Sequence, residues 1–381
     1  ELQPPSMSLQ LSPGAGLSLA VLVQMTFTGN SLVGGRMELQ VAANISSSSR
    51  LVRDARGCPR LSAGRCRVAL LSASTNLPSR VMTPAARKFL ESTLQRLLPG
   101  LLCPAVDMVL DLVNAKFTAM TSVIALGSAG TLRYALLDPP VVSASFIQLE
   151  LETILHSREG EEVLTAEQLP LTSLPPKKDN ATQLVLSAGF LSAELRVMQA
   201  SFSLNISNSM VLGLPPLGTT MLGALVPEIS SVLPPSQPVV IEMQEVKPPL
   251  VTITPNKSTV HLFSTAEFWV PSPDSAPRSL FVLDVHTELG AHFAVAEERL
   301  QLSLALDSLS QAAVANSSVG AFDALPLRAV LADIVHVAFV PSINRALRGG
   351  VPLPPLPSAL YQHVELSRMQ DGLVLDVPVT E

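Results

Sequence analysis

Apolar and polar residues alternate along many stretches of this chain. In residues 17–28 the odd positions are apolar, and in residues 37–44 the apolar residues again alternate with polar ones such as Glu38. A period of two is typical of a strand in an antiparallel sheet, which buries one face and leaves the other in water. The same pattern recurs in residues 147–152, 202–206, 281–289 and 300–307. We therefore expect a chain built largely of antiparallel sheet.

Three stretches follow a helical period instead. Thr83 can cap a helix whose first residue is Pro84, and a second helical segment is expected after Pro99. A short amphipathic helix is expected over residues 218–233. A long helix is expected from about residue 323 to 347, buried on nearly all sides, which Pro341 should kink or end.

The order of these segments indicates two similar α+β units in tandem, each a curled antiparallel sheet wrapped on a long helix. A chain of 381 residues also exceeds the size of most single cores. A charge-rich segment that ends in prolines and lysines reads as a linker. We expect a first domain at 1–152, a linker at 153–178 and a second domain at 179–381.

The composition is apolar for a soluble protein. Hydrophobic residues make up 47% and charged residues 15%, which excludes disorder. The mean hydropathy is +0.38, yet no uninterrupted apolar run approaches the ~20 residues of a membrane span. The apolar excess fits either a core with an internal lipid cavity or a Leu- and Val-rich packed core.

Charge is unevenly distributed along the chain. The net charge of −6 argues against a nucleic-acid partner. Residues 1–152 carry 13 Lys and Arg against 9 Asp and Glu, and the remainder carries 12 against 22. This asymmetry suggests that one end meets an anionic surface.

Six arginines lie close together in the sequence. Because guanidinium groups bind phosphate bidentately, they form a candidate patch for anionic head groups. The alternative is a solvated loop whose charge Asp54 partly offsets. The arginines are Arg50, Arg53, Arg56, Arg60, Arg65 and Arg67.

Motifs of catalysis are missing from the sequence. The six histidines are scattered, and there is no HExxH, G-x-S-x-G, dinucleotide-loop or P-loop motif. His286 shares the polar phase of a strand with Asp284 and Glu288, as on a solvated face. We expect no enzymatic activity and no metal site.

Five Asn-x-Ser/Thr sequons favour a secreted glycoprotein. Two of them fall on the polar phase of expected strands, where a glycan can be accommodated. The sequons begin at Asn44, Asn180, Asn205, Asn256 and Asn316.

Three stretches together resemble a known family. The first carries Cys58 beside Pro59, then Cys66, and Cys103 beside Pro104; the second is the proline-marked linker; the third is residues 340–354. In this order they resemble the BPI/LBP/PLUNC/CETP lipid-binding superfamily, in particular the full-length BPI fold-containing family B type. The resemblance implies two elongated barrels, joined by a central sheet in a boomerang shape.

The resemblance also implies a disulfide between Cys66 and Cys103, which leaves Cys58 as a buried thiol. The alternative is a bond between Cys58 and Cys103. Each barrel would hold acyl chains in an apolar groove, whose lining residues the sequence does not identify; the alternative is a packed core. No cofactor is implied beyond a bound phospholipid or fatty acid.

Two features depart from the family pattern. The long amphipathic helix with which family members begin has no counterpart in these residues. Arginines also replace the lysine-rich loops of the endotoxin-binding members, which weakens the transfer of that activity.

The expected protein is secreted, extracellular and non-enzymatic. It would bind phospholipid or lipopolysaccharide in innate host defence, with lipids, lipopolysaccharide or anionic membranes as partners. The oligomeric state is not predicted. The alternatives are a lipid carrier without antibacterial action, and a structural or surface-active protein without a specific ligand.

Overall fold

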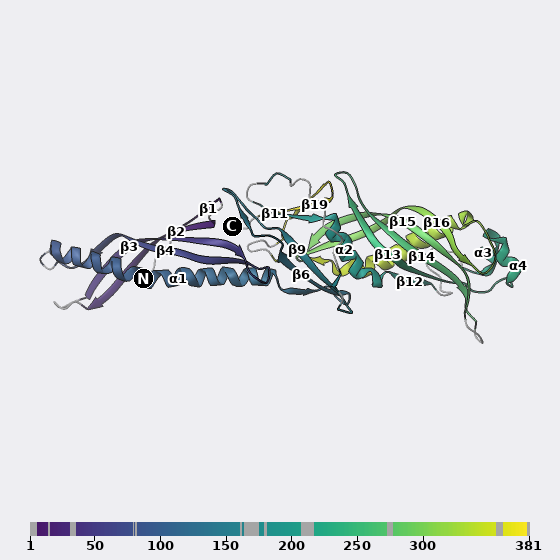
Figure 1. Cartoon of the computed structure of the whole chain (residues 1–381), viewed down its shortest axis with the longest axis horizontal. Coiled ribbons are helices and arrows are strands. Elements are labelled where there is room, and N and C mark those ends of the chain that lie inside the picture. The colour runs from purple at the N-terminus through teal and green to yellow at the C-terminus, as the bar shows by residue number, and fades with distance from the viewer. Residues whose placement is uncertain are drawn as a thin grey trace. The chain divides into compact units, whose positions relative to one another are not determined.

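The computed structural model divides the chain into two units (Figure 1). Unit 1 comprises Glu1–Ser122 and Tyr134–Glu152, and unit 2 comprises Val123–Arg133 and Thr153–Glu381. The structure describes residues 6–13, 16–30, 36–78, 80, 82–160, 162–163, 175–178, 181–206, 217–272, 277–355 and 361–378.

The sheet of unit 1 confirms the alternation seen in the sequence. Its four antiparallel strands follow the order β1-β2-β3-β4. Alternate residues of β2 and β3 point inward and are at most 8% exposed: Val21, Val23, Leu39, Val41, Ala43 and Ile45. The strands are β1 (Ser6–Ser12), β2 (Gly16–Asn30), β3 (Arg36–Arg53) and β4 (Pro59–Thr75).

A single helix, α1 (Pro84–Met120), packs on the edge of this sheet (Figure 1). The hydroxyl of Thr83 accepts from the Ala86 N–H at 3.3 Å, which confirms the expected cap. The expected break after Pro99 is wrong, because the helix continues through Pro99 and Pro104. Contacts with β4 on both sides of the prolines hold α1 together despite the lost backbone donors.

Short strands follow α1 in the chain, and the last of them extend into the linker expected at residues 153–178. One sheet has the strand order β10-β9-β6-β5, and β7 pairs with β8 in another. Residues 153–157, placed in the linker from sequence, continue a strand, and 164–174 lie outside the described residues. The strands are β5 (Val123–Ala125), β6 (Gly130–Leu136), β7 (Val141–Val142), β8 (Ile147–Gln148), β9 (Leu151–Ser157) and β10 (Glu162–Val163).

Unit 2 contains a larger antiparallel sheet of order β12-β13-β14-β15-β16-β17 and a smaller one of order β11-β19-β18. Neither this sheet nor that of unit 1 closes on itself by strand pairing among the described residues. The strands are β11 (Ala181–Ser187), β12 (Ser203–Ile206), β13 (Val240–Ile253), β14 (Ser258–Val270), β15 (Arg278–Ala296), β16 (Arg299–Ser317), β17 (Val351–Pro352), β18 (Glu365–Met369) and β19 (Gly372–Pro378).

The helices of unit 2 differ from the expectation in two ways. Helix α2 (Ala188–Met198), capped by the Ser187 hydroxyl, was not predicted. The segment expected at 218–233 forms two short helices, α3 (Thr219–Leu225) and α4 (Pro227–Val232).

The last helical stretch is continuous from residue 325 to 349 and does not end at Pro341. It contains α5 (Arg328–Ile334), a π-helical turn at Val335–Phe339 and α6 (Val340–Ala346). The wider π turn precedes Pro341, which lacks a backbone donor, so the chain passes the proline without a break. The stretch is buried on one side only, because Arg328, Asp333 and His336 are exposed.

Two helical stretches are long and apolar enough to cross a membrane by length and composition alone: Pro84–Met120 and Leu325–Gly349. Both stretches contain prolines and charged residues, so neither is an uninterrupted apolar run of that length. The Leu325–Gly349 stretch packs against β16 inside unit 2. Helix α1 differs, since only 11% of its most apolar window is buried.

Candidate functional site

Helix α1 carries an apolar surface that its own sheet does not cover. One side of the helix packs on the sheet through Leu98, Val106 and Leu110, which are 1%, 6% and 9% exposed. A neighbouring side, which we call the apolar stripe, is 51–68% exposed. A run of large exposed hydrophobic side chains marks a binding surface in soluble proteins. The apolar stripe consists of Leu101, Met108, Val109 and Leu112.

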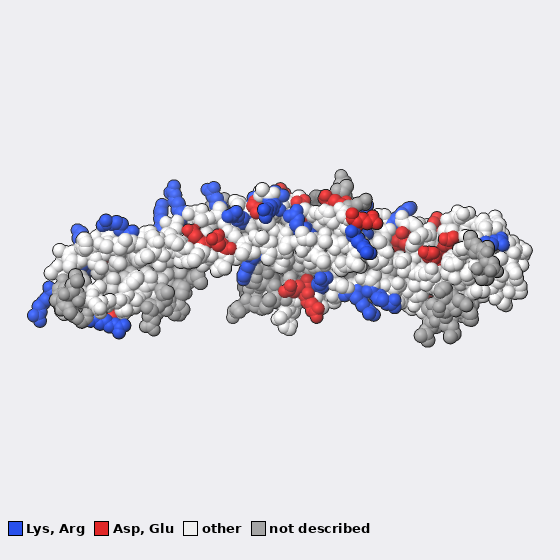
Figure 2. All heavy atoms as spheres, turned by 90° about the horizontal axis from the view of Figure 1, so that it is seen from below, with Lys and Arg blue, Asp and Glu red and all other residues white. Residues whose placement is uncertain are grey.

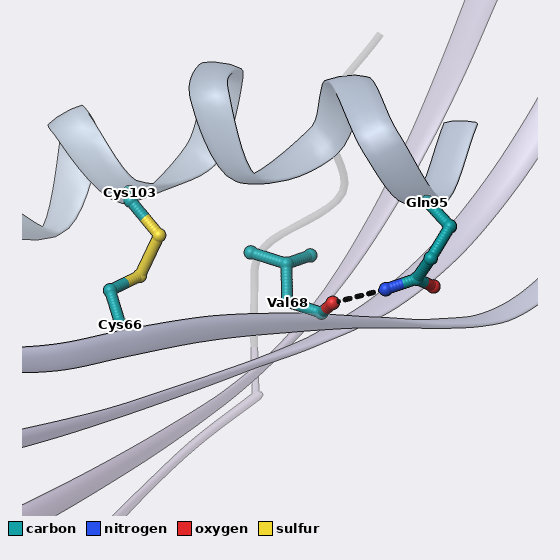
Figure 3. Close-up of a disulfide and its surroundings, with 4 residues drawn as sticks. All are labelled: Cys66, Val68, Gln95 and Cys103. Carbon is teal, nitrogen blue, oxygen red and sulfur yellow. Dashed lines mark hydrogen bonds between the residues drawn. A yellow bond between two sulfur atoms is a disulfide. The ribbon is translucent and has the colours of Figure 1, made fainter. Parts of the chain in front are cut away.

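Three ties fix α1 to the edge strand β4 and so fix the direction of the stripe. The structure joins Cys66 of β4 to Cys103 of α1 by a disulfide (Figure 3), the pair that the family resemblance implies. The side-chain amide of Gln95 donates to the Val68 carbonyl at 2.7 Å (Figure 3) and accepts from the Leu70 N–H at 2.9 Å. The disulfide closes a loop with a sequence separation of 37.

The third tie is Asn114. Its side-chain oxygen accepts from the Leu61 N–H at 2.7 Å, and its Nδ2 donates to the Leu61 carbonyl at 3.0 Å. Unit 2 repeats the device, since Asn344 of α6 makes both bonds to Leu304 of β16, each at 2.8 Å. A side-chain amide thus replaces a missing neighbouring strand in both units.

The six arginines of the sequence cluster are all exposed, but they do not share one surface. Arg50, Arg60 and Arg67 lie on the outward phase of β3 and β4, opposite the buried residues. We call these three the outer arginine patch. Across the two strands Arg50 pairs with Ser62 and Arg67 with Ser46, whereas Arg60 pairs with Val52.

The other three arginines have different surroundings. Arg53 donates from Nε to the Leu136 carbonyl at 2.6 Å and lies 4.0 Å from the Glu152 carboxylate. Arg56 lies in the β3–β4 turn, where its N–H donates to Asp54. Arg65 lies at a register shift between the two strands. Arg53 therefore has a structural role that its sequence position did not reveal.

The positions of the sequons follow the strand pattern. Asn205, Asn256 and Asn316 are exposed, and Asn44 is half-buried on the outward phase of β3. Asn180 lies outside the described residues. The thiol of Cys58 is buried, with Sγ 2.6 Å from the hydroxyl of Thr121.

A small cavity in unit 2 contains a side chain that the sequence did not single out. Glu194 of α2 is 1% exposed, and neither carboxyl oxygen has a hydrogen-bond partner in the described part of the chain. Burial raises the pKa of Glu194 to about 8, so the group is neutral at pH 7. The other lining residues are all apolar: Leu191, Leu195, Met198, Leu300, Leu302, Leu347, Gly350 and Val351.

Sequence reasoning missed Glu194 because it missed α2. The carboxylate of Glu194 lies among apolar side chains and so weakens the helical pattern of residues 188–198. Two signals were available: Ser187, which caps the helix, and the apolar spacing of Phe190, Leu191 and Leu195.

A second buried carboxyl has a structural explanation. Glu245 lies at a register shift between β13 and β14, where it accepts from the Ser264 hydroxyl at 2.5 Å and the Phe263 N–H at 3.0 Å. Burial raises its pKa to about 7, against the lowering effect of these two bonds. The carboxyl supplies the acceptor that the strand lacks at its bulge.

No group of three or more His, Cys, Asp or Glu side chains that could hold a metal ion occurs within the described residues. His286 packs edge-on against Phe263, and His261 lies 3.9 Å from Glu288. These side chains lie on the polar strand face that the sequence indicated.

Comparison with known proteins assigns the whole chain to one family. The model of the LBP / BPI / CETP family, N-terminal domain, matches residues 1–114, and that of the C-terminal domain matches residues 126–380. The human BPI fold-containing family B member 6 is 37% identical over 99% of this chain and 84% of its own length. The human family B member 4 is 33% identical over 98% of this chain and 62% of its own length.

More distant relatives share the fold. The bactericidal permeability-increasing protein of Sebastes schlegelii is 25% identical over 98% of this chain and 82% of its own. The crystal structure of lipopolysaccharide binding protein matches with a TM-score of 0.60 at 21% identity, over 99% of this chain and 85% of that one. The predicted resemblance and the two-domain α+β fold are thereby confirmed, and the chain belongs to the LBP/BPI/CETP family, among the BPI fold-containing family B proteins.

Proposed function

We propose that this protein is a secreted lipid-binding protein that holds acyl chains against the apolar stripe of α1. The observation that carries the proposal is the exposure of Leu101, Met108 and Leu112, at 63%, 63% and 68%, on a helix tied firmly to its sheet. Each acyl CH₂ group that leaves water for such a surface contributes about 0.8 kcal/mol. Burial of acyl chains on the stripe requires no catalytic group.

The head group of the bound lipid is proposed to be anionic. Residues 39–90 contain nine Lys and Arg and a single acid, Asp54. The Asp54 carboxylate is already engaged, since its Oδ1 accepts from the N–H groups of Arg56 and Cys58. Figure 2 shows more Lys and Arg than Asp and Glu on the visible face of unit 1. This excess of positive charge supports binding of phosphate-bearing lipids.

Lipopolysaccharide, in innate host defence, is the finer candidate. The family relationship with a bactericidal permeability-increasing protein supports it. A lipid carrier without antibacterial action is the alternative. Salt-sensitive binding to lipopolysaccharide, with weak binding to phosphatidylcholine vesicles, would favour the defence function. Equal transfer of neutral and anionic phospholipids between vesicles would favour the carrier.

Native mass spectrometry of the purified glycoprotein, with organic extraction of bound molecules, tests lipid binding. We expect co-purified phospholipid or fatty acid in stoichiometric amount. The double variant Leu101→Glu/Leu112→Glu should lose it, because two carboxylates cannot be desolvated against acyl chains.

The matched control is Ser92→Glu/Thr118→Glu, which adds the same charge at exposed polar positions of the same helix. It should retain the lipid. A lipid-free wild-type protein that takes up nothing from vesicles contradicts the proposal and favours a structural or surface-active role. Equal lipid content in both variants would mean that the lipid does not bind at the apolar stripe of α1.

A further inference from the structure

The sequon at Asn44 lies on the same face of the unit 1 sheet as the outer arginine patch. Asn44 belongs to the outward phase of β3, between the buried residues Ala43 and Ile45. Ser46, which completes this sequon, is the next residue on that face and is exposed. Because Ser46 pairs with Arg67 across β3 and β4, the sequon and the patch are direct neighbours.

The strand register gives the spacing between the sequon and the three arginines. Arg67 is the diagonal neighbour of Asn44 across β3 and β4, and such positions are roughly 7–8 Å apart. Arg50 lies six positions along β3 from Asn44, and Arg60 lies opposite a residue eight positions along it. At about 3.4 Å per residue, these two lie about 20 and 27 Å from Asn44. A glycan on Asn44 therefore reaches Arg67 first and Arg60 last.

Only small side chains lie between the sequon and Arg67. Asn44 pairs with Ala69 of β4, and Ala42 and Ser46 are its neighbours along the outward face of β3. These side chains leave the innermost sugars of an N-linked glycan free to lie against the sheet. Arg67 makes no ion pair within the described part of the chain, so its guanidinium can contact either a sugar hydroxyl or a lipid phosphate.

We propose that an N-linked glycan on Asn44 covers Arg67 and lowers the affinity of the outer arginine patch for anionic lipid head groups. Such a glycan is bulky and hydrated, so it keeps a membrane surface away from the guanidinium. Occupancy of this one sequon then sets how tightly the protein binds an anionic membrane. The inference rests on the proposed function, in which the head group is anionic, and adds a modification that controls its affinity.

The test measures binding of the secreted glycoprotein to phosphatidylglycerol vesicles. Asn44→Gln removes the sequon, and Ser46→Ala removes it while the asparagine stays. We expect either change to tighten binding about two- to fivefold, as for one exposed ion pair, and to steepen the dependence on salt. Asn316→Gln removes a sequon from unit 2 and should bind as wild type does. Enzymatic removal of glycans from the folded protein should tighten binding by wild type but not by Asn44→Gln.

Two further backgrounds assign the effect to Arg67. In Arg67→Gln, loss of the Asn44 glycan should bring no gain in affinity, because the guanidinium that the glycan covers is absent. In Arg60→Gln, which loses the same charge far from the sequon, the gain should remain. An equal gain in both backgrounds would refute the proposal. So would a mass spectrum of wild-type peptides in which Asn44 carries no glycan.

A chemical measurement tests the coverage of Arg67 without any lipid. Phenylglyoxal modifies accessible guanidinium groups, and removal of the Asn44 glycan should increase its reaction with Arg67 more than with Arg60. Unchanged labelling of Arg67 would overturn the proposal. Absence of vesicle binding in every form would overturn the proposed anionic head group and this inference with it, whereas equal binding in every form would overturn this inference alone.

Discussion

At the residue scale, Glu194 makes the stability of unit 2 depend on pH. Its pKa is about 8 in the folded protein, against 4.5 for an ordinary glutamate. Between these values the folded state binds more protons than the unfolded state. The free energy of unfolding therefore falls as pH rises through this window, by at most about 1.4 kcal/mol per pH unit. Glu245 adds the same trend between 4.5 and about 7.

We expect Glu194→Gln to flatten this dependence, most clearly above pH 7, where Glu194 alone of these two still titrates. Urea unfolding at pH 5, 7 and 8.5 measures it. Glu242→Gln, which removes an exposed carboxylate from β13, is the control and should follow wild type. Parallel curves for wild type and Glu194→Gln would mean that the Glu194 carboxyl reaches water in the native state.

The sequence allowed some residues to be placed and not others. The alternation predicted which residues of β2 and β3 are buried, because strand geometry alone decides the face. The alternation did not show that Arg53 differs from the other arginines of the cluster. Its hydrogen bond to the Leu136 carbonyl joins positions 83 residues apart. Local patterns carry no information about such a contact.

At the scale of the elements, the prolines of α1 show where local rules fail. Pro99 favours a helix end when only its neighbours are considered. The ties from Gln95, Cys103 and Asn114 to β4 hold the helix on both sides of it. Tertiary contacts thus decide the length of α1. Local sequence rules do not include these contacts with β4, so they predict two shorter helices.

The repeated amide device can be tested in both units. Asn114→Ala should free the N–H and C=O of Leu61, and Asn344→Ala those of Leu304. We expect each change to destabilise its own unit by about 1–2 kcal/mol, the cost of unmet buried hydrogen bonds. Hydrogen exchange followed by mass spectrometry measures the protection of backbone amides in each unit separately.

Each variant is the control for the other. Faster exchange in β4 and α1 is expected only for Asn114→Ala, and in β16 and α6 only for Asn344→Ala. Unchanged exchange in both would mean that the sheet edges exchange with water regardless of the amides, and that packing alone holds the helices.

At the scale of the whole molecule, the two parts of the chain carry net charges of opposite sign. The positive excess belongs to residues 1–152 and the negative excess to the remainder. An anionic vesicle should therefore attract unit 1 more strongly than unit 2. Screening by salt, with a Debye length of about 8 Å at physiological ionic strength, should weaken this attraction.

The triple variant Arg50→Gln/Arg60→Gln/Arg67→Gln measures how much of the attraction comes from the outer arginine patch. We expect weaker binding to phosphatidylglycerol vesicles and a shallower dependence of the dissociation constant on salt, because three guanidinium contacts are lost. Arg196→Gln/Arg278→Gln/Arg348→Gln removes the same charge from exposed positions of unit 2 and is the control. If both triple variants lose affinity equally, net charge rather than the patch governs binding. If only the first does, the outward face of β3 and β4 is where anionic head groups are bound.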